Sequence, residues 1–163
     1  MRLCMIGSGY VGLVSGVCFA DIGNQVVCVD KDKNKIEKLN SGVSPIYEPG
    51  LDELIKKNFT AKRLSFTSNI YRAISTSDII SIHVIKTKET QNLISKDKLN
   101  LLKKSAILIN TSRGGVVDED YLIDLLRSNK LFGAGLDVYS EEPPKNIVNI
   151  ENVNLVTTPH IGA

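Results

Sequence analysis

Residues 2–30, RLCMIGSGYVGLVSGVCFADIGNQVVCVD, decide the fold of this chain. An apolar run at residues 3–6 predicts a strand, the glycine-rich stretch 7–12 predicts a sharp turn into a helix, and residues 25–29 predict a second strand. Asp30 follows that strand, about 20 residues after the glycines. This order predicts a Rossmann dinucleotide-binding fold, a doubly wound α/β fold with a mostly parallel sheet in three layers.

Each glycine of the GSGYVG motif has its own task. Gly7 permits the tight turn, Gly9 lets the backbone approach a pyrophosphate, and Gly12 lets the helix lie close to the strand. The free N–H groups that begin the helix would face the phosphates. Asp30 would accept hydrogen bonds from the adenosine ribose and repel a 2′-phosphate, so the sequence predicts NAD and not NADP. The alternative is a buried βαβ unit whose glycines serve only packing.

The size and charge of the chain narrow the class of protein. A chain of 163 residues can bury about two thirds of its unfolded surface, so we expect residues 1–163 to form one NAD-binding domain without a separate substrate domain. The net charge is +2 and lysines alternate with acids, which argues against a nucleic-acid or membrane partner. We expect a cytoplasmic location, because neither a signal segment nor an apolar window of membrane-spanning length is visible.

The three cysteines indicate a reducing compartment. Cys4, Cys18 and Cys28 fall in the first strand, the helix and the second strand, where we expect all three to lie in the core as small hydrophobes. They lack paired spacing and have no nearby histidine, so neither a disulfide framework nor a metal site is expected.

The rest of the chain alternates strands with helices. Strands are predicted at 64–67, 78–84, 106–109, 133–138 and 153–157. Helices are predicted at 33–40, 51–59 and 70–74, after Ser95, where the helix would carry Leu99, Leu101 and Leu102, and after Asp118. Turns are predicted at 45–50 and 141–145. The charged run 31–38 is most simply the solvated side of a helix with Ile36 and Leu39 inward. Short connections between such elements specify a parallel sheet with helices on both faces.

Ligands of such sheets bind beyond the carboxyl ends of the strands. The candidates are therefore the residues that directly follow each strand: 7–12, Asp30, 83–87, 110–114, 137–142 and His160. Within them, Thr87 and Thr111 are candidate cofactor contacts. His83 is more simply a strand-end residue near the cofactor.

The segments MIGSGYVGLVSG, VCVDKDKNKIEKLNSG, PIYEPGLDELI and DIISI, between residue 1 and about residue 81, resemble the start of the UDP-glucose 6-dehydrogenase family. PIYEPGLDEL is the specific part, because plain Rossmann proteins lack it. The resemblance implies that Asp30 holds the adenosine ribose and that the pyrophosphate is held by Gly7, Gly9, Tyr10, Val11 and Gly12. The catalytic cysteine and lysine of that family have no counterpart here, so sugar-nucleotide oxidation is not expected.

The segments HVIKTKETQNLI, AILINTSRGGVVDEDYLIDLL, GAGLDVYSEEPP and TPHIGA, between about residue 78 and residue 163, resemble the D-2-hydroxyacid dehydrogenases, D-3-phosphoglycerate dehydrogenase most closely. This resemblance implies that Arg113 binds the substrate carboxylate, Glu142 orients the base, His160 exchanges the hydroxyl proton, and Asp137 contacts the nicotinamide carboxamide. One departure is the loop at 85–86, where Ile-Lys replaces the Pro-Leu of that family.

These residue types suit the implied chemistry. A guanidinium can bind a 2-oxo carboxylate through two hydrogen bonds, and a histidine can exchange a proton near neutral pH, with a nearby glutamate favouring its charged form. Taken singly, Arg113 could pair with a surface acid, His160 could be only a terminal residue, and Glu142 could be polar because it lies in a turn. Their order at three strand ends favours the inherited site.

The two patterns meet near residues 78–84, in a strand that both families share. The chain therefore looks like a recombination of two NAD-binding domains, and an engineered chimera and a natural fusion both fit. We expect a NAD(H)-binding domain with little or no turnover alone. The alternatives are an active NAD-dependent 2-hydroxyacid dehydrogenase, completed by a partner chain or a homodimer and acting on a small 2-hydroxy or 2-oxo acid, and a folded chimera without cofactor binding.

Overall fold

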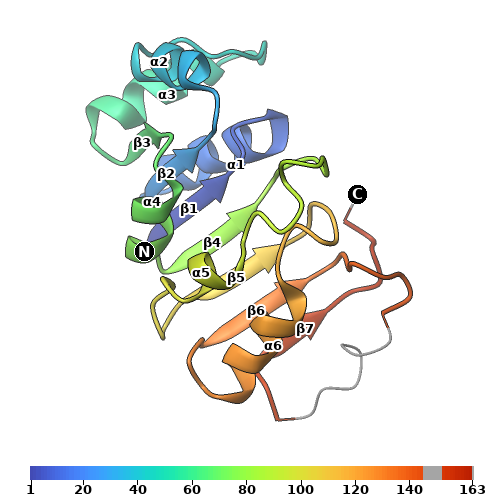
Figure 1. Ribbon diagram of the computed structural model, residues 1–163. Helices are drawn as coiled ribbons and strands as arrows, with labels where there is room; N and C mark the ends of the chain where they lie inside the picture. The colour runs from blue at the N-terminus through green and yellow to red at the C-terminus, as the bar shows by residue number, and fades with distance from the viewer. Residues whose placement is uncertain (145–151, 163) are drawn as a thin grey trace.

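The computed structural model describes residues 1–144 and 152–162, and in them seven parallel strands form one sheet in the order β3-β2-β1-β4-β5-β6-β7 (Figure 1). The strands are β1 Arg2–Ile6, β2 Gln25–Val29, β3 Leu64–Thr67, β4 Ile79–Ile82, β5 Ile107–Asn110, β6 Gly133–Leu136 and β7 Leu155–Thr157. The helices are α1 Tyr10–Asp21, α2 Lys33–Asn40, α3 Leu51–Thr60, α4 Ile70–Thr76, α5 Lys96–Leu99 and α6 Glu119–Arg127. This arrangement confirms the doubly wound Rossmann fold.

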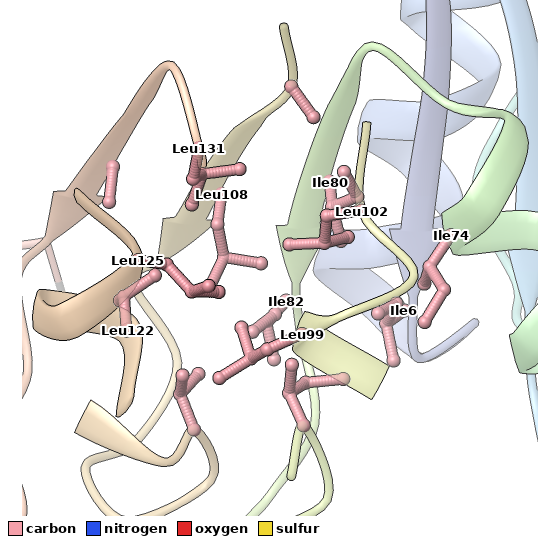
Figure 2. Packing of buried hydrophobic residues seen from close by; sticks show 14 of the residues in the cluster. Ile6, Ile74, Ile80, Ile82, Leu99, Leu102, Leu108, Leu122, Leu125 and Leu131 are labelled. Atoms are coloured by element: carbon pink, nitrogen blue, oxygen red, sulfur yellow. The ribbon is translucent and has the colours of Figure 1, made fainter. Parts of the chain in front are cut away.

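Successive strand residues point to opposite faces of the sheet, so their side chains contribute to two hydrophobic clusters, one on each face. Leu3 and Met5 of β1 pack with α1, α2 and α3 in one cluster, whereas Cys4 and Ile6 belong to the other cluster with α4, α5 and α6. Figure 2 shows the second cluster, in which the three helices contribute Ile74, Leu99 and Leu122 beside strand residues such as Ile80 and Leu108. The sheet is therefore the middle of three layers.

Polar side chains fix the first turn of three helices. The carboxylate of Asp32 accepts from the backbone N–H groups of Asn34 and Lys35 at the start of α2, and that of Asp118 accepts from Tyr121 N–H at the start of α6. The amide oxygen of Asn69 caps α4 in the same way. Such caps satisfy N–H groups that a helix leaves without partners, so they define where each helix begins.

β4 joins the two halves of the sheet without a change of register. Its residues from Ile79 to Ile82 pair with Leu3 to Ile6 of β1 on one side and with Ile107 to Asn110 of β5 on the other. The strand in which the two sequence patterns meet is therefore continuous with both neighbours, and the halves form one sheet.

Two sequence predictions are wrong in this part of the molecule. Cys18 is exposed, because α1 turns Leu13, Val17 and Ala20 toward the core and leaves Cys18 and Phe19 on the opposite side. The helix expected to carry the leucines after Ser95 is the single turn α5, which ends at Leu99. Leu99 and Leu102 are buried, but Leu101, beyond the helix, is exposed.

Three predicted strands are shorter in the structure. Residues 78–84 form β4 only over Ile79–Ile82, residues 133–138 form β6 only to Leu136, and residues 153–157 form β7 only from Leu155. At the start of β7, the N–H of Leu155 donates to the carbonyl of Val153 at 2.9 Å. This hydrogen bond closes a tight turn, so the first residues of the predicted strand form a turn and not part of the sheet. Of the turn predicted at 141–145, Lys145 lies outside the described residues.

Across 1–144 and 152–162, none of the helices has the length and apolarity of a membrane span. The same residues contain no group of three or more His, Cys, Asp or Glu that could hold a metal ion.

Candidate functional site

The glycine turn lies at the point where the strand order reverses. β2 and β3 follow β1 on one side and β4 lies on the other, so the carboxyl ends of β1 and β4 frame the crevice where sheets of this kind bind ligands. Gly7 leaves β1 with φ of +100° and donates its N–H to Val29 O at 2.8 Å. A pocket of about 400 Å³ opens here, and Gly7, Gly9, Asp30 and Thr87 line it.

The three glycines of the turn differ in their surroundings. A Cβ on Gly12 would lie 1.9 Å from Gly7 O, and a Cβ on Gly7 would lie 2.5 Å from His83 O. Close backbone packing therefore requires both glycines. A Cβ on Gly9 would meet no atom within 4 Å, so packing does not account for Gly9. The open space beside it is what a bound pyrophosphate needs.

The first turn of α1 also fits a phosphate group. Gly9 is the N-cap of α1 and no side chain caps the helix, so Tyr10 and Val11, both exposed, begin it without a side-chain acceptor for their N–H groups. The buried hydroxyl of Ser8 has no hydrogen-bond partner among the described residues. An acceptor at this turn would satisfy a donor that is costly to bury alone.

Asp30 follows β2 and is held in its charged form. Its carboxylate accepts hydrogen bonds from Ser8 N at 3.1 Å, Asp32 N at 3.1 Å and Lys35 Nζ at 2.7 Å. Burial acts to raise the pKa of Asp30, but the hydrogen bonds from Lys35, Asp32 and Ser8 outweigh it and hold the pKa below its usual value. The side chain is therefore an anionic acceptor beside the glycine turn.

Lys35 and the residues across the pocket were not anticipated from the sequence. The run 31–38 does form the solvated side of α2, with Ile36 and Leu39 buried as predicted. Lys35, however, points back toward the end of β2, where its ammonium group pairs with Asp30. Lys31 pairs with Glu89 of the loop after β4, and both side chains line the pocket. Lys31 and Glu89 are too far apart in the chain for a local sequence pattern to predict their contact.

Three further candidates lie around the ends of β4 and β5. Thr87 lines the pocket, and its loop is held by Thr90 Oγ1, which donates to Ile85 O at 2.6 Å. His83 also lines the pocket, with Nε2 2.9 Å from Ser81 Oγ, and burial lowers its pKa. Thr111 is exposed after β5 and is not among the residues that line this pocket.

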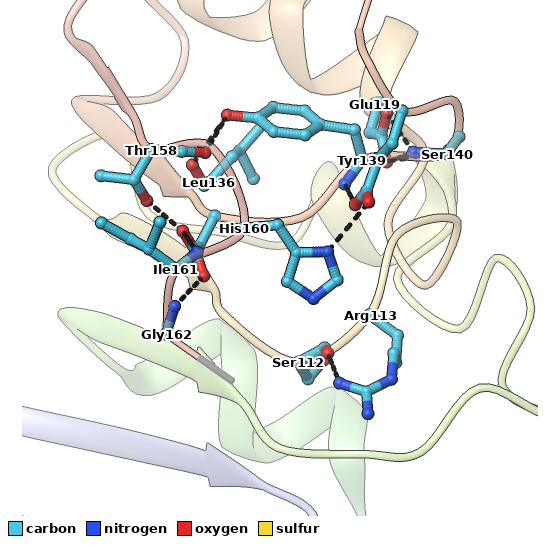
Figure 3. Close-up of polar contacts among 12 residues, drawn as sticks. Ser112, Arg113, Glu119, Leu136, Tyr139, Ser140, Thr158, His160, Ile161 and Gly162 are labelled. Atoms are coloured by element: carbon cyan, nitrogen blue, oxygen red, sulfur yellow. Dashed lines mark hydrogen bonds and ion pairs between the residues drawn. The ribbon is translucent and has the colours of Figure 1, made fainter.

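The residues expected to act on a substrate gather beyond the ends of β5, β6 and β7 (Figure 3). His160 Nδ1 lies 2.9 Å from Glu142 Oε2, so the structure brings the expected base and its orienting carboxylate together. The hydrogen bond from His160, followed by that from Tyr139 N–H, lowers the pKa of Glu142. Arg113 is exposed, and its Nη1 donates to Ser112 O at 2.6 Å.

Asp137 anchors the segment that carries His160. Its carboxylate accepts from Thr158 Oγ1, from Ile161 N at 3.0 Å and from Gly162 N at 2.7 Å (Figure 3). These bonds bracket His160, whose φ is +55°. The Thr158 and backbone donors lower the pKa of Asp137. Both carboxylate oxygens thus already have partners in the protein, and Asp137 does not line the cofactor pocket.

Glu119 ties together the two loops that carry Arg113 and Glu142. Its Oε1 accepts from Ser140 N and Ser140 Oγ, each at 2.8 Å, and from Gly115 N at 3.3 Å. The loops also touch through their backbones, because a Cβ on Gly114 would lie 1.7 Å from Tyr139 O. Sequence reasoning missed Glu119, which reads there only as a polar residue of the first turn of a helix.

The parallel sheet, its switch point and the glycine turn define a dinucleotide-binding domain of the dehydrogenase class. Residues 1–113 match the NAD binding domain of the UDP-glucose/GDP-mannose dehydrogenase family, and the chain belongs to that family. NAD is thus confirmed as the cofactor of this kind of domain.

Relatives of two kinds match the chain. The UDP-glucose 6-dehydrogenase of Rhizobium meliloti (strain 1021) is 56% identical over 84 residues, which cover 52% of this chain and 19% of the relative. The D-3-phosphoglycerate dehydrogenase of Archaeoglobus fulgidus is 37% identical over 120 residues, which cover 72% of this chain and 22% of the relative. The chain therefore spans about a fifth of the length of these relatives.

A solved structure shows the same fold. The D-isomer specific 2-hydroxyacid dehydrogenase of Xanthobacter autotrophicus Py2, in complex with NADPH and MES, superposes with a TM-score of 0.77 at 24% identity, covering 100% of this chain and 59% of that one. The two resemblances seen in the sequence are confirmed, and the chain is a hybrid of two NAD-binding patterns.

Proposed function

We propose that residues 1–163 are a single NAD(H)-binding oxidoreductase domain with little or no turnover by itself. The observation that carries the proposal is the open space at Gly9 beside the charged Asp30, in a pocket of about 400 Å³. In the proposed complex Asp30 accepts from the adenosine ribose and Thr87 contacts the same half of the cofactor. The pyrophosphate lies against Gly7, Gly9, Tyr10, Val11 and Gly12.

The proposed reaction uses the residues beyond β5, β6 and β7. Arg113 binds the carboxylate of a small 2-oxo acid through its guanidinium, and His160 gives a proton to the substrate oxygen, or takes one from the 2-hydroxy acid in the reverse direction. Glu142, whose pKa is lowered, holds Nδ1 of His160. Bound NADH supplies a hydride. All three side chains are exposed in this chain, and access of water is our reason for expecting slow turnover.

Two observations favour a second candidate, a working 2-hydroxyacid dehydrogenase completed by a partner or a second copy. The His160–Glu142 contact is already formed in the isolated chain. On the face of the sheet that bears α1, Val156 is 66% exposed and Ile107 and Ile109 are only half-buried. Apolar surface of this kind tends to associate. A molar mass by light scattering that rises with concentration would favour a homodimer.

An NADH titration by fluorescence, with NADPH as the control, tests cofactor binding. We expect saturable binding that prefers NADH. Gly9→Val should abolish binding by filling the open space, whereas Asp30→Ala should weaken it and relax the discrimination against NADPH. Thermal unfolding of each variant controls for folding. A cooperatively folded chain that binds neither cofactor would leave the third possibility, a folded chimera without a cofactor site.

Turnover separates the two remaining candidates. Oxidation of NADH is followed with a panel of 2-oxo acids over a range of protein concentrations, with His160→Gln as the control. Absent or very slow turnover at all concentrations supports the binding domain. Rates per chain that rise with protein concentration, and that His160→Gln abolishes, support the self-completed enzyme.

A further inference from the structure

We infer that Glu89 determines how strongly this domain prefers NADH to NADPH, by holding Lys31 in an ion pair at the cofactor pocket. The inference rests on the proposed NAD(H) binding and concerns the same pocket. It assigns a specificity role to a residue outside the glycine turn and outside the strand end that carries Asp30.

Four charged side chains line the pocket. Lys35 Nζ pairs with Asp30 Oδ2 at 2.7 Å, and Lys31 pairs with Glu89. Two lysines and two carboxylates give this group no net charge. Each ammonium faces a carboxylate, so its positive charge is partly neutralised toward a further anion at the pocket.

NADPH differs from NADH by a phosphate on the adenosine ribose, the part of the cofactor expected at Asp30. That phosphate needs a cationic partner, and a lysine ammonium can serve as a point charge. Lys31 follows Asp30 directly in the chain and lines the same pocket. Lys31 is thus the nearest cation in sequence to the ribose acid, and Glu89 keeps its charge neutralised.

The pair joins the two halves of the hybrid. Lys31 belongs to the segment VCVDKDKNKIEKLNSG, which resembles the UDP-glucose 6-dehydrogenases, and Glu89 belongs to HVIKTKETQNLI, which resembles the D-2-hydroxyacid dehydrogenases. The contact therefore depends on both patterns being present in one chain. The cofactor preference of the hybrid should accordingly not be inherited from the first half alone.

The pair can be broken without damage to the fold. The side chains of Lys31 and Glu89 are 75% and 71% exposed, and exposed pairs contribute little to stability. The loop around Glu89 is held independently, since Thr90 Oγ1 donates to Ile85 O and Thr87 N donates to Thr90 Oγ1. Substitutions at these two positions therefore test binding and not folding.

The experiment measures dissociation constants for NADH and NADPH by fluorescence titration at low ionic strength in five proteins. They are the unmodified chain, Glu89→Gln, Lys31→Gln, the double variant, and Glu37→Gln. The last makes the same change of charge on the exposed surface of α2, away from the pocket. Glu89→Gln should tighten NADPH binding about twofold to fivefold while NADH changes little.

The controls separate the pair from a general change of charge. We expect the gain in NADPH affinity to disappear in the double variant, to be absent in Glu37→Gln, and to shrink in higher salt. An unchanged ratio of the two constants in Glu89→Gln, or an equal gain in Glu37→Gln or in the double variant, overturns the inference and leaves cofactor binding intact. Failure of the unmodified chain to bind either cofactor overturns the proposed function, and this inference with it.

Discussion

The glycine turn of the first half and the His160 loop of the second half are held in different ways. The turn is fixed by backbone packing, since a Cβ on Gly12 would overlap Gly7 O and a Cβ on Gly7 would overlap His83 O. The His160 loop is fixed by the carboxylate of Asp137, which accepts from the backbone N–H groups of Ile161 and Gly162. The neighbouring loops are fixed by the carboxylate of Glu119, which accepts from the N–H and hydroxyl groups of Ser140. The first region should therefore respond mainly to steric changes, and the second mainly to changes of charge and hydrogen bonding.

The largest effect should come from Gly12→Ala. The added methyl group would overlap Gly7 O, and forced packing of this kind costs roughly 1–3 kcal/mol or more of the free energy of unfolding. Gly9→Ala is the matched control, because nothing lies within 4 Å of its Cβ position. Urea unfolding of both variants measures the difference. Equal losses of stability would contradict the close packing that we assign to Gly12.

Asp137→Asn should loosen the second region and leave the first unchanged. The amide of asparagine keeps one accepting oxygen and replaces the other with an NH2 donor, so one of the N–H groups of Ile161 and Gly162 loses its acceptor. These N–H groups should therefore exchange with solvent faster, while NADH affinity changes little. Asp97→Asn, in the first turn of α5, is the control. Weaker NADH binding without faster exchange would instead support the nicotinamide contact that the family resemblance implies for Asp137.

Acid should destabilise the chain through His83, next to the glycine turn. Burial lowers the pKa of His83, so the unfolded chain takes up this proton at a pH of about 6.5 while the folded chain resists it. Stability is therefore lost as the pH falls below that value, by at most about 1.4 kcal/mol per pH unit for one group. Urea unfolding at pH 7 and pH 5 should show a smaller loss for His83→Gln. Identical losses would contradict this role.

The smallest expected effect concerns how fast a reagent modifies the three cysteine thiols of the folded chain. Cys18 is exposed on α1, whereas Cys4 and Cys28 are buried, and burial raises the pKa of Cys4 to about 12. A coloured thiol reagent should therefore modify one thiol quickly in the folded chain and the other two only on unfolding. Cys18→Ser should remove the fast phase. More than one fast thiol would show that the core around β1 and β2 opens readily.

Much of the fold follows from local pattern. The bounds of β2 and α2 match the prediction residue for residue, because a short apolar run and the helical spacing of Ile36 and Leu39 are short-range signals. Cys18 was misplaced because its neighbours are also apolar, so the inward side of α1 was ambiguous. The helix after Ser95 was overextended, since the leucines that suggested it continue into a loop.

The candidate site was only partly predictable. Strand-end residues such as Asp30 could be found, because the carboxyl ends of parallel strands share one edge. The approach of Glu142 to His160 was expected from the family resemblance, and the structure shows it. The contacts of Glu119 and of Lys31 with Glu89 join loops far apart in sequence and leave no periodic signal.

The unbroken register of β4 has a consequence for how NAD-binding domains diversify. The ladder on either side of this strand consists of main-chain hydrogen bonds, which do not depend on which side chains the neighbouring strands carry. A short apolar strand at the centre of the sheet is therefore a natural crossover point for exchanging genetic segments. One lineage can contribute the segment that binds the nucleotide and another the loops that carry the reactive residues. The joined sheet then needs no further substitutions at the strand where the two segments meet.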